Sequence, residues 1–210
     1  MQQRLPLPVP AVRWPPKAGV RGFSLAEMMI VIAVIGVLAA IAFPSFTSVV
    51  NGGRLSGMTN ELVASIQIAR TEAIRRNVRA VVCPSANGTS CSGGSNWSAG
   101  WMVFFDNDRN DAPGGVGDTV LRYVQGNAPT QVLTSPAIGA ALVFRPDGRA
   151  RVAGTGAGSG ALVRGTIAVC LPVTQPTNNI RDVTITFGSQ VSLTRRNGGG
   201  ACAAPADPAP

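Results

Sequence analysis

Histidine is absent from this 210-residue chain, and lysine occurs only once, at Lys17. The absence of histidine removes the commonest general base and the commonest metal ligand. The sequence also contains no G-x-S-x-G nucleophile motif. We therefore expect neither an enzyme nor a resident cofactor.

Four cysteines lie in the second part of the chain, at Cys83, Cys91, Cys170 and Cys202. An even number of cysteines suggests disulfides formed in an oxidising compartment. Four cysteines allow three pairings, of which sequence proximity favours Cys83–Cys91 with Cys170–Cys202. A zinc site is the alternative, and the absence of any C-x-x-C spacing argues against it.

The N-terminal region changes character abruptly. Residues 1–22 are basic and proline-rich and contain no acid, whereas every residue from Met28 to Phe43 is apolar or glycine. As a helix, Phe23 to Phe43 would be about 31 Å long, close to the thickness of a hydrocarbon core of roughly 30 Å. The basic flank precedes the apolar run, which predicts a single span with residues 1–22 in the cytoplasm and the rest outside.

A secretory signal peptide is the competing interpretation of this region. It would have a shorter apolar stretch followed by a small-residue cleavage site, for which Ala39-Ala40 could be mistaken. The length of the apolar run opposes this interpretation. So does the hexad that precedes the run, Gly22-Phe23-Ser24-Leu25-Ala26-Glu27.

This hexad resembles the prepilin peptidase site of type IV pilins and type II secretion pseudopilins. The resemblance implies cleavage between Gly22 and Phe23, N-methylation of the new N-terminus, and retention of residues 23–50 as a transmembrane and assembly helix. It also implies four partners: the prepilin peptidase, other pilins or pseudopilins, an inner-membrane assembly platform and the lipid bilayer. The chain would then be a single-pass inner-membrane protein that becomes part of a filament.

Glu27 lies at the start of the apolar helix. A carboxylate in mid-bilayer costs up to about 3 kcal/mol, so Glu27 could simply stay hydrated at the interface. The pilin resemblance implies instead that it pairs with the amine of a neighbour's Phe23 during assembly, which would favour the correct axial register.

Residues 51–202 are expected to form a periplasmic head, beginning with a flexible point at Gly52-Gly53 and an amphipathic helix over residues 60–77. Short β runs joined by Gly, Pro and Asn loops follow, at Arg79–Cys83, Trp101–Phe105, Thr119–Gln125, Ala140–Arg145, Arg149–Val152, Ala161–Leu171 and Asp182–Arg195. The predicted fold is therefore α+β: a long N-terminal helix followed by a small antiparallel sheet. Residues 203–210 are predicted to be a flexible tail.

The last β run allows a prediction of register. A three-residue loop at Gly188-Ser189-Gln190 would pair Phe187 with Val191 and Ile185 with Leu193. One face of the hairpin would then be wholly apolar.

Within the pilin-like group, the head resembles the GspH/FimT family. The matching stretches are Ala69–Arg76, Val82–Ser85 and Trp97–Asp106, together with the late Cys170 and Cys202. The resemblance implies a minor pilin or pseudopilin at or near a filament tip, without separating a type IV pilus from type II secretion. We expect Trp97 and Trp101 to be apolar anchors of the head core.

An acidic loop raises the question of calcium. Oxygen-bearing residues alternate at Asp106, Asp108 and Asn110, as at the start of a Ca²⁺-binding loop. However, Asp111 stands where that loop requires glycine, and Gly117 stands where it requires glutamate. A solvated acidic loop is the favoured interpretation, and a metal site is a weaker candidate.

The arginine excess raises the question of DNA. The net charge is +8, and arginine is well suited to phosphate contacts. Some FimT-like proteins are thought to capture DNA through a C-terminal Gly-Arg-x-Arg element, but this chain has Gly188-Ser189-Gln190-Val191 there. Arg195 and Arg196 lie nearby and could substitute; alternatively, they pair with acids such as Asp182.

Overall fold

The computed structural model describes residues 22–154 and 160–209. Apart from Gly22, the predicted leader lies outside the described residues. The chain divides into two compact units, Met1–Ile41 and Ala42–Pro210. In the first unit the described residues form the beginning of helix α1, and the second unit contains all the strands.

Helix α1 spans Leu25–Arg76 and runs through Gly52 and Gly53 without a break. The predicted flexible point is therefore wrong, and the predicted helix of the head is the end of this longer helix. Each glycine costs about 1 kcal/mol relative to alanine within a helix. Burial of Leu55 and Leu62 against the sheets, just after the glycines, offsets that cost.

Within the described residues, nine strands follow the helix, in two antiparallel sheets. Their bounds are β1 (Arg79–Pro84), β2 (Gly100–Asp106), β3 (Thr119–Gln125), β4 (Gln131–Thr134), β5 (Leu142–Phe144), β6 (Ala150–Val152), β7 (Gly165–Cys170), β8 (Ile180–Ile185) and β9 (Val191–Arg196). The sheet orders are β3-β2-β1-β5-β6 and β4-β7-β8-β9. The predicted α+β class is confirmed, although β4 was not predicted.

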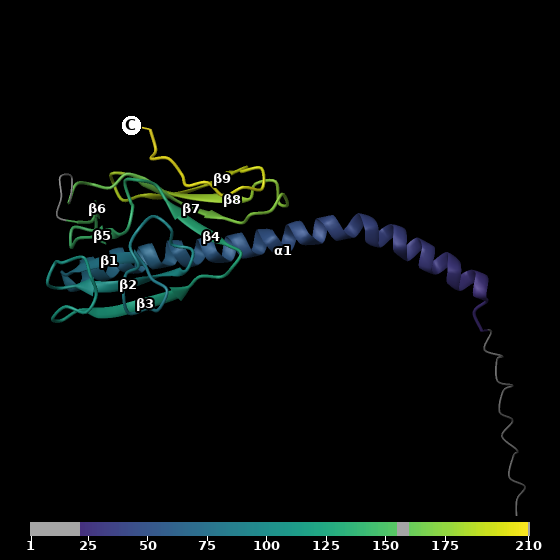
Figure 1. The fold of residues 1–210 in the computed structure, drawn as a ribbon, viewed down its shortest axis with the longest axis horizontal. Helices are drawn as coiled ribbons and strands as arrows, with labels where there is room; N and C mark the ends of the chain where they lie inside the picture. Colours follow the sequence, from purple (N-terminus) through teal and green to yellow (C-terminus); the bar gives the residue numbers. More distant parts are fainter. Residues whose placement is uncertain (1–21, 155–159, 210) are drawn as a thin grey trace, which may run out of the picture. The chain divides into compact units, whose positions relative to one another are not determined.

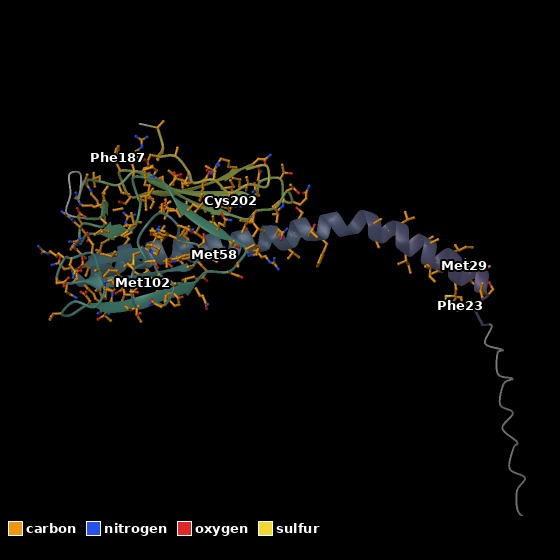
Figure 2. The ribbon with its side chains drawn as sticks, in the orientation of Figure 1. Phe23, Met29, Met58, Met102, Phe187 and Cys202 are labelled. Carbon is orange, nitrogen blue, oxygen red and sulfur yellow. A yellow bond between two sulfur atoms is a disulfide. The ribbon has the colours of Figure 1, made fainter. Side chains whose placement is uncertain are left out.

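The head segment of α1, residues 55–73, packs against both sheets. In Figure 1, β7–β9 are drawn above it and β2–β3 below it. The buried helix residues are Leu55, Met58, Leu62, Ile66, Ala69 and Ala73. They recur at helical spacing and give this part of the helix one apolar stripe. Met58 lies on this stripe, whereas Met102 belongs to a second apolar cluster on the other face of the first sheet (Figure 2).

Trp97 and Trp101 are fully buried in the core, as predicted. Each indole N–H also has an acceptor: the carbonyl of Gly139 lies 3.2 Å from Trp97 Nε1, and Ser65 Oγ lies 2.9 Å from Trp101 Nε1. Both rings are therefore buried without an unsatisfied donor.

The β8–β9 hairpin has a different register from the one predicted. Ile185 pairs with Val191 and Val183 with Leu193, so the loop comprises residues 186–190. The shift is by two residues, which preserves the predicted alternation between the faces. Phe187 lies outside the ladder and is exposed, at the end of the head labelled in Figure 2.

Two contacts from outside the hairpin explain the longer loop. Ser189 is buried with a φ of 55°. The N–H of Ala150 donates to its hydroxyl at 2.6 Å, and Arg70 Nη1 donates to its carbonyl at 3.0 Å. The wider loop lets Ser189 reach these partners on β6 and α1, which the pattern of the hairpin alone could not reveal.

The C-terminal segment after Cys202, predicted to be a flexible tail, contacts the head at two described positions. Pro205 is buried, and the backbone N–H of Ala137 donates to Asp207 at 3.1 Å.

Candidate functional site

The predicted processing segment lies at the start of α1. Gly22, Phe23 and Ser24 precede the helix and have no regular secondary structure. A Cβ atom added to Gly22 would meet no other atom within 4 Å. Nothing in the described chain therefore requires glycine at position 22, and a requirement for it would come from the predicted processing step.

Ser24 and Glu27 form a helix N-terminus of the capping-box type. The backbone N–H of Glu27 donates to Ser24 Oγ at 3.2 Å, and Glu27 is the third residue of the helix. A carboxylate in the first turn also interacts favourably with the helix dipole. Glu27 thus has a local role besides the predicted role in assembly. The S-x-x-E spacing of Ser24 and Glu27 is the sequence signal for this role.

The first part of α1 exposes large apolar side chains all round. The exposed residues include Leu25, Met29, Ile30, Ile32, Ile35, Val37 and Leu38. By length and composition this helix could cross a membrane. Phe23 and Met29 project away from the backbone at this end in Figure 2. A helix that is apolar on all sides requires lipid or other helices around it.

The four cysteines form two disulfides, Cys83–Cys91 and Cys170–Cys202. This is the pairing that sequence proximity favours. Cys83 belongs to the apolar cluster on the side of the first sheet that faces away from α1, and Cys170 to the corresponding cluster on the second sheet. Each disulfide therefore ties a loop or the C-terminal segment to the outward face of one sheet.

A buried ion pair lies where β1 and β2 meet, at the end of α1. Arg79 Nε is 3.3 Å from Asp106 Oδ2, and Arg79 also pairs with Asp111. The Asp106 side chain is fully buried and accepts the N–H groups of Asn110 at 3.0 Å and of Asp111 at 3.4 Å. Burial raises the pKa of Asp106, while the charge of Arg79 opposes that shift.

Replacing Arg79 with methionine should destabilise the head by about 3 kcal/mol at pH 7, because Asp106 would remain buried without its cation. Since the pKa of Asp106 is already raised in the folded state, its contribution to stability falls as pH rises above the ordinary aspartate range. The loss in Arg79→Met should therefore be smaller at pH 4 than at pH 7. Urea unfolding of the full chain in detergent at both pH values measures this difference.

Adding Asp106→Asn to the Arg79→Met variant provides the control. The double variant carries no buried charge at this position, so it should recover much of the loss at pH 7 and show a weaker pH dependence. A loss in Arg79→Met that is the same at both pH values would contradict the assignment to Asp106.

The structure brings the weak calcium candidates together in one loop. The N–H of Asn110 donates to Asp106, and the amide of Asn110 donates to Asp108 at 2.8 Å. One oxygen from each of Asp106, Asp108 and Asp118 lies within 4.8 Å of the others. Asp118, which follows the loop and lies next to β3, was not among the residues predicted from the sequence.

Backbone donors already occupy several of these oxygens. The two oxygens of Asp118 accept the N–H groups of Asn107 and Gly115, both at 2.8 Å. The carboxylates therefore hold the loop closed through these hydrogen bonds, and calcium binding stays the weaker alternative to a solvated acidic loop.

The two arginines considered for DNA lie on opposite faces of the second sheet. Arg196 donates to both oxygens of Asp182, at 2.7 and 3.1 Å, and this hydrogen bonding raises the pKa of Arg196. Arg195 lies directly opposite Arg181 in the ladder, and among the described residues it forms no ion pair. Arg181 was not among the residues predicted from the sequence, because only the register of the hairpin shows what lies opposite Arg195.

Comparison with known proteins gives two family matches. Residues 58–190, more than half of the chain, match the family described as type II transport protein GspH. Residues 17–43 match the prokaryotic N-terminal methylation motif.

Two curated pilins of Moraxella bovis are similar to the N-terminal region. Type IV major alpha-pilin and fimbrial protein Q are each 46% identical to this chain over 44 residues, which is 21% of this chain and 28% of theirs. The match therefore spans little more than a quarter of the length of these relatives.

Two crystal structures of the Pseudomonas aeruginosa type IV minor pilin FimU are also similar, at 19% identity. The alignments cover 66% and 68% of this chain and 91% and 89% of that chain, with TM-scores of 0.44 and 0.45. The GspH match over residues 58–190 and the methylation motif over residues 17–43 show that the chain belongs to the GspH/FimT family of type IV minor pilins and pseudopilins.

Proposed function

We propose that the chain is a minor pilin or pseudopilin that helps to assemble a type IV pilus or a type II secretion pseudopilus. The family consists of structural subunits rather than enzymes. The observation that carries the proposal is the methylation motif over residues 17–43, which includes the exposed apolar beginning of α1. Such a segment is suited to storage in a bilayer before it enters a filament.

Maturation would begin with removal of residues 1–22 by prepilin peptidase. Gly22 and Phe23 lie outside α1, so the bond between them does not have to be freed from helical hydrogen bonds before cleavage. Residues 23–50 would then anchor the protein in the inner membrane. The head, residues 51–202, would lie in the periplasm, where both disulfides are stable.

Assembly would move the apolar helix from lipid into a bundle of similar helices. In that dry environment, the carboxylate of Glu27 would bind the amine of a neighbour's Phe23. A misplaced subunit would leave both charges buried and unpaired, which is strongly unfavourable. The pair would therefore select the axial position at which a new subunit joins, and the inner-membrane platform would be the partner that drives this step.

A deletion strain complemented with the full chain tests the proposal. Without the gene, we expect loss of sheared surface filaments or loss of type II secretion, and the affected process identifies the system. The complete chain should restore that process, whereas a chain lacking residues 25–43 should not. Unchanged filaments and unchanged secretion in the deletion strain would contradict the proposed function.

DNA capture for natural transformation is the second candidate. The observation that favours it is that Arg195 is exposed and forms no ion pair within the described ranges. Arg196, by contrast, is held by Asp182. A salt-dependent gel shift of duplex DNA by the full chain in detergent, lost in Arg195→Ala, would support this function. No shift at low salt would exclude it.

A further inference from the structure

A groove lies between the head segment of α1 and the β8–β9 hairpin. Its volume is about 300 Å³, and its lining residues are Ser56, Thr59, Asn60, Arg181, Leu193, Thr194 and Arg195. The helix therefore contributes hydroxyl and amide groups, while the strands contribute two cations and one apolar side chain.

The two arginines face each other. Arg181 and Arg195 are directly opposite partners in the antiparallel ladder. They share the face of Val183, which is buried in the core, and they extend that face beyond the apolar residues. Directly opposite side chains have Cβ atoms about 4.5–5.5 Å apart, and like charges in that arrangement are destabilising.

No acid relieves this repulsion in the part of the chain that the structure describes. Arg181 donates only to the carbonyls of Asn178 at 2.7 Å and Ile180 at 3.2 Å. Burial and the charge of Arg195 lower the pKa of Arg181. Arg196, which follows Arg195 in the chain, differs from both because it forms an ion pair with Asp182 on the other face of the sheet.

The surroundings of the groove indicate a protein as its occupant. Leu193, between the two cations and the core, is 53% exposed. A nucleic acid backbone would bind the cations but leave this apolar side chain in water, whereas a neighbouring subunit could cover both the cations and Leu193.

We propose that this groove binds a carboxylate side chain of a neighbouring subunit, which would neutralise Arg181 and Arg195 while apolar residues of that subunit cover Leu193. The proposal rests on the proposed function, because it requires a neighbour alongside α1. It assigns the groove to the contact between heads, in addition to the contact between apolar helices.

Arg195→Lys provides a direct chemical test. Lys17, in the leader, is the only lysine of the chain, so the substitution places a unique side-chain amine in the mature protein and keeps the charge. A carbodiimide joins an amine to a contacting carboxylate as an amide. Applied to intact assemblies in membranes, it should join the variant to a second subunit, and peptide mass spectrometry should place the bond at an Asp or Glu of that subunit.

Arg149→Lys is the matched control, because Arg149 is exposed and lies outside the groove. It should give no adduct with a second subunit. Equal amounts of the adduct from both variants, or no adduct from Arg195→Lys, would overturn the proposal.

A second variant separates assembly from folding. Arg195→Gln removes the repulsion with Arg181, so the melting temperature of the isolated chain in detergent should rise by about 1–3 °C. Its recovery in sheared filaments or membrane assemblies should nevertheless fall roughly tenfold or more, because a partner carboxylate loses one of its two cations. A purely structural role would change stability and assembly in the same direction.

The remaining outcomes distinguish this inference from the proposed function. If the wild-type chain assembles and Arg195→Gln assembles equally well, only the groove assignment fails. If the wild-type chain does not assemble at all, both fail. If Arg195→Gln loses a duplex-DNA gel shift but keeps full assembly, the groove binds phosphate, and the carboxylate assignment is overturned.

Discussion

Glu27→Gln is expected to reduce incorporation of the chain into filaments or pseudopili by about 30-fold or more. The reason is that removing one partner of a buried charge pair costs about 2–5 kcal/mol, and 1.4 kcal/mol corresponds to a factor of ten. Glutamine has nearly the same size and also suits the third position of a capping box. The substitution therefore removes the charge while retaining the helix N-terminus that Ser24 caps.

Glu61→Gln is the matched control for this effect. Glu61 is a carboxylate on the same helix, half-exposed and paired with Arg122, and an exposed pair of this kind contributes little. We expect normal incorporation of Glu61→Gln, measured by immunoblot of sheared filaments against membranes. Normal incorporation of Glu27→Gln would show that Glu27 serves only to cap the helix.

Trp101→Ala should lower the free energy of unfolding of the head by about 3–5 kcal/mol, because it removes a large, fully buried side chain from the core. It also removes the N–H that donates to Ser65 Oγ at 2.9 Å. Ser65 is itself buried, although its hydroxyl still donates to the carbonyl of Glu61 at 2.8 Å. Urea unfolding of the full chain in detergent measures the loss.

Trp101→Phe separates the two contributions. It keeps an aromatic ring in the core but lacks the indole N–H, so its loss should be clearly smaller than that of Trp101→Ala. A loss below about 1 kcal/mol in Trp101→Ala would be too small for a buried tryptophan, and it would contradict the placement of this ring between α1 and the sheets.

The N-terminal leader and apolar segment could be predicted from sequence because their signals are local. The change from a basic leader to an apolar run and the hexad at Gly22–Glu27 need no tertiary information. The continuation of the helix beyond Gly53 was harder to predict. Gly52 and Gly53 lower helix propensity locally, and only the burial of the residues after them, such as Leu55, explains why the helix continues.

The head shows where local patterns stop being sufficient. Strand alternation predicted which faces of β8 and β9 are apolar, but the register depended on the contacts of Ser189 with Ala150 and Arg70, which are distant in sequence. The partners of the arginines at the end of β9 depended on the same register. Arg195 and Arg196 are adjacent in sequence, yet one faces Arg181 and the other binds Asp182.

The proposed function requires that the apolar segment is retained after the leader is removed. Mass spectrometry of the N-terminal peptide of the membrane-bound protein tests it most directly. We predict a peptide that starts at Phe23 and carries one methyl group on its amine, whereas a Gly22→Val chain should keep residues 1–22. A mature protein that starts well beyond Phe23, without the apolar stretch, would contradict the account.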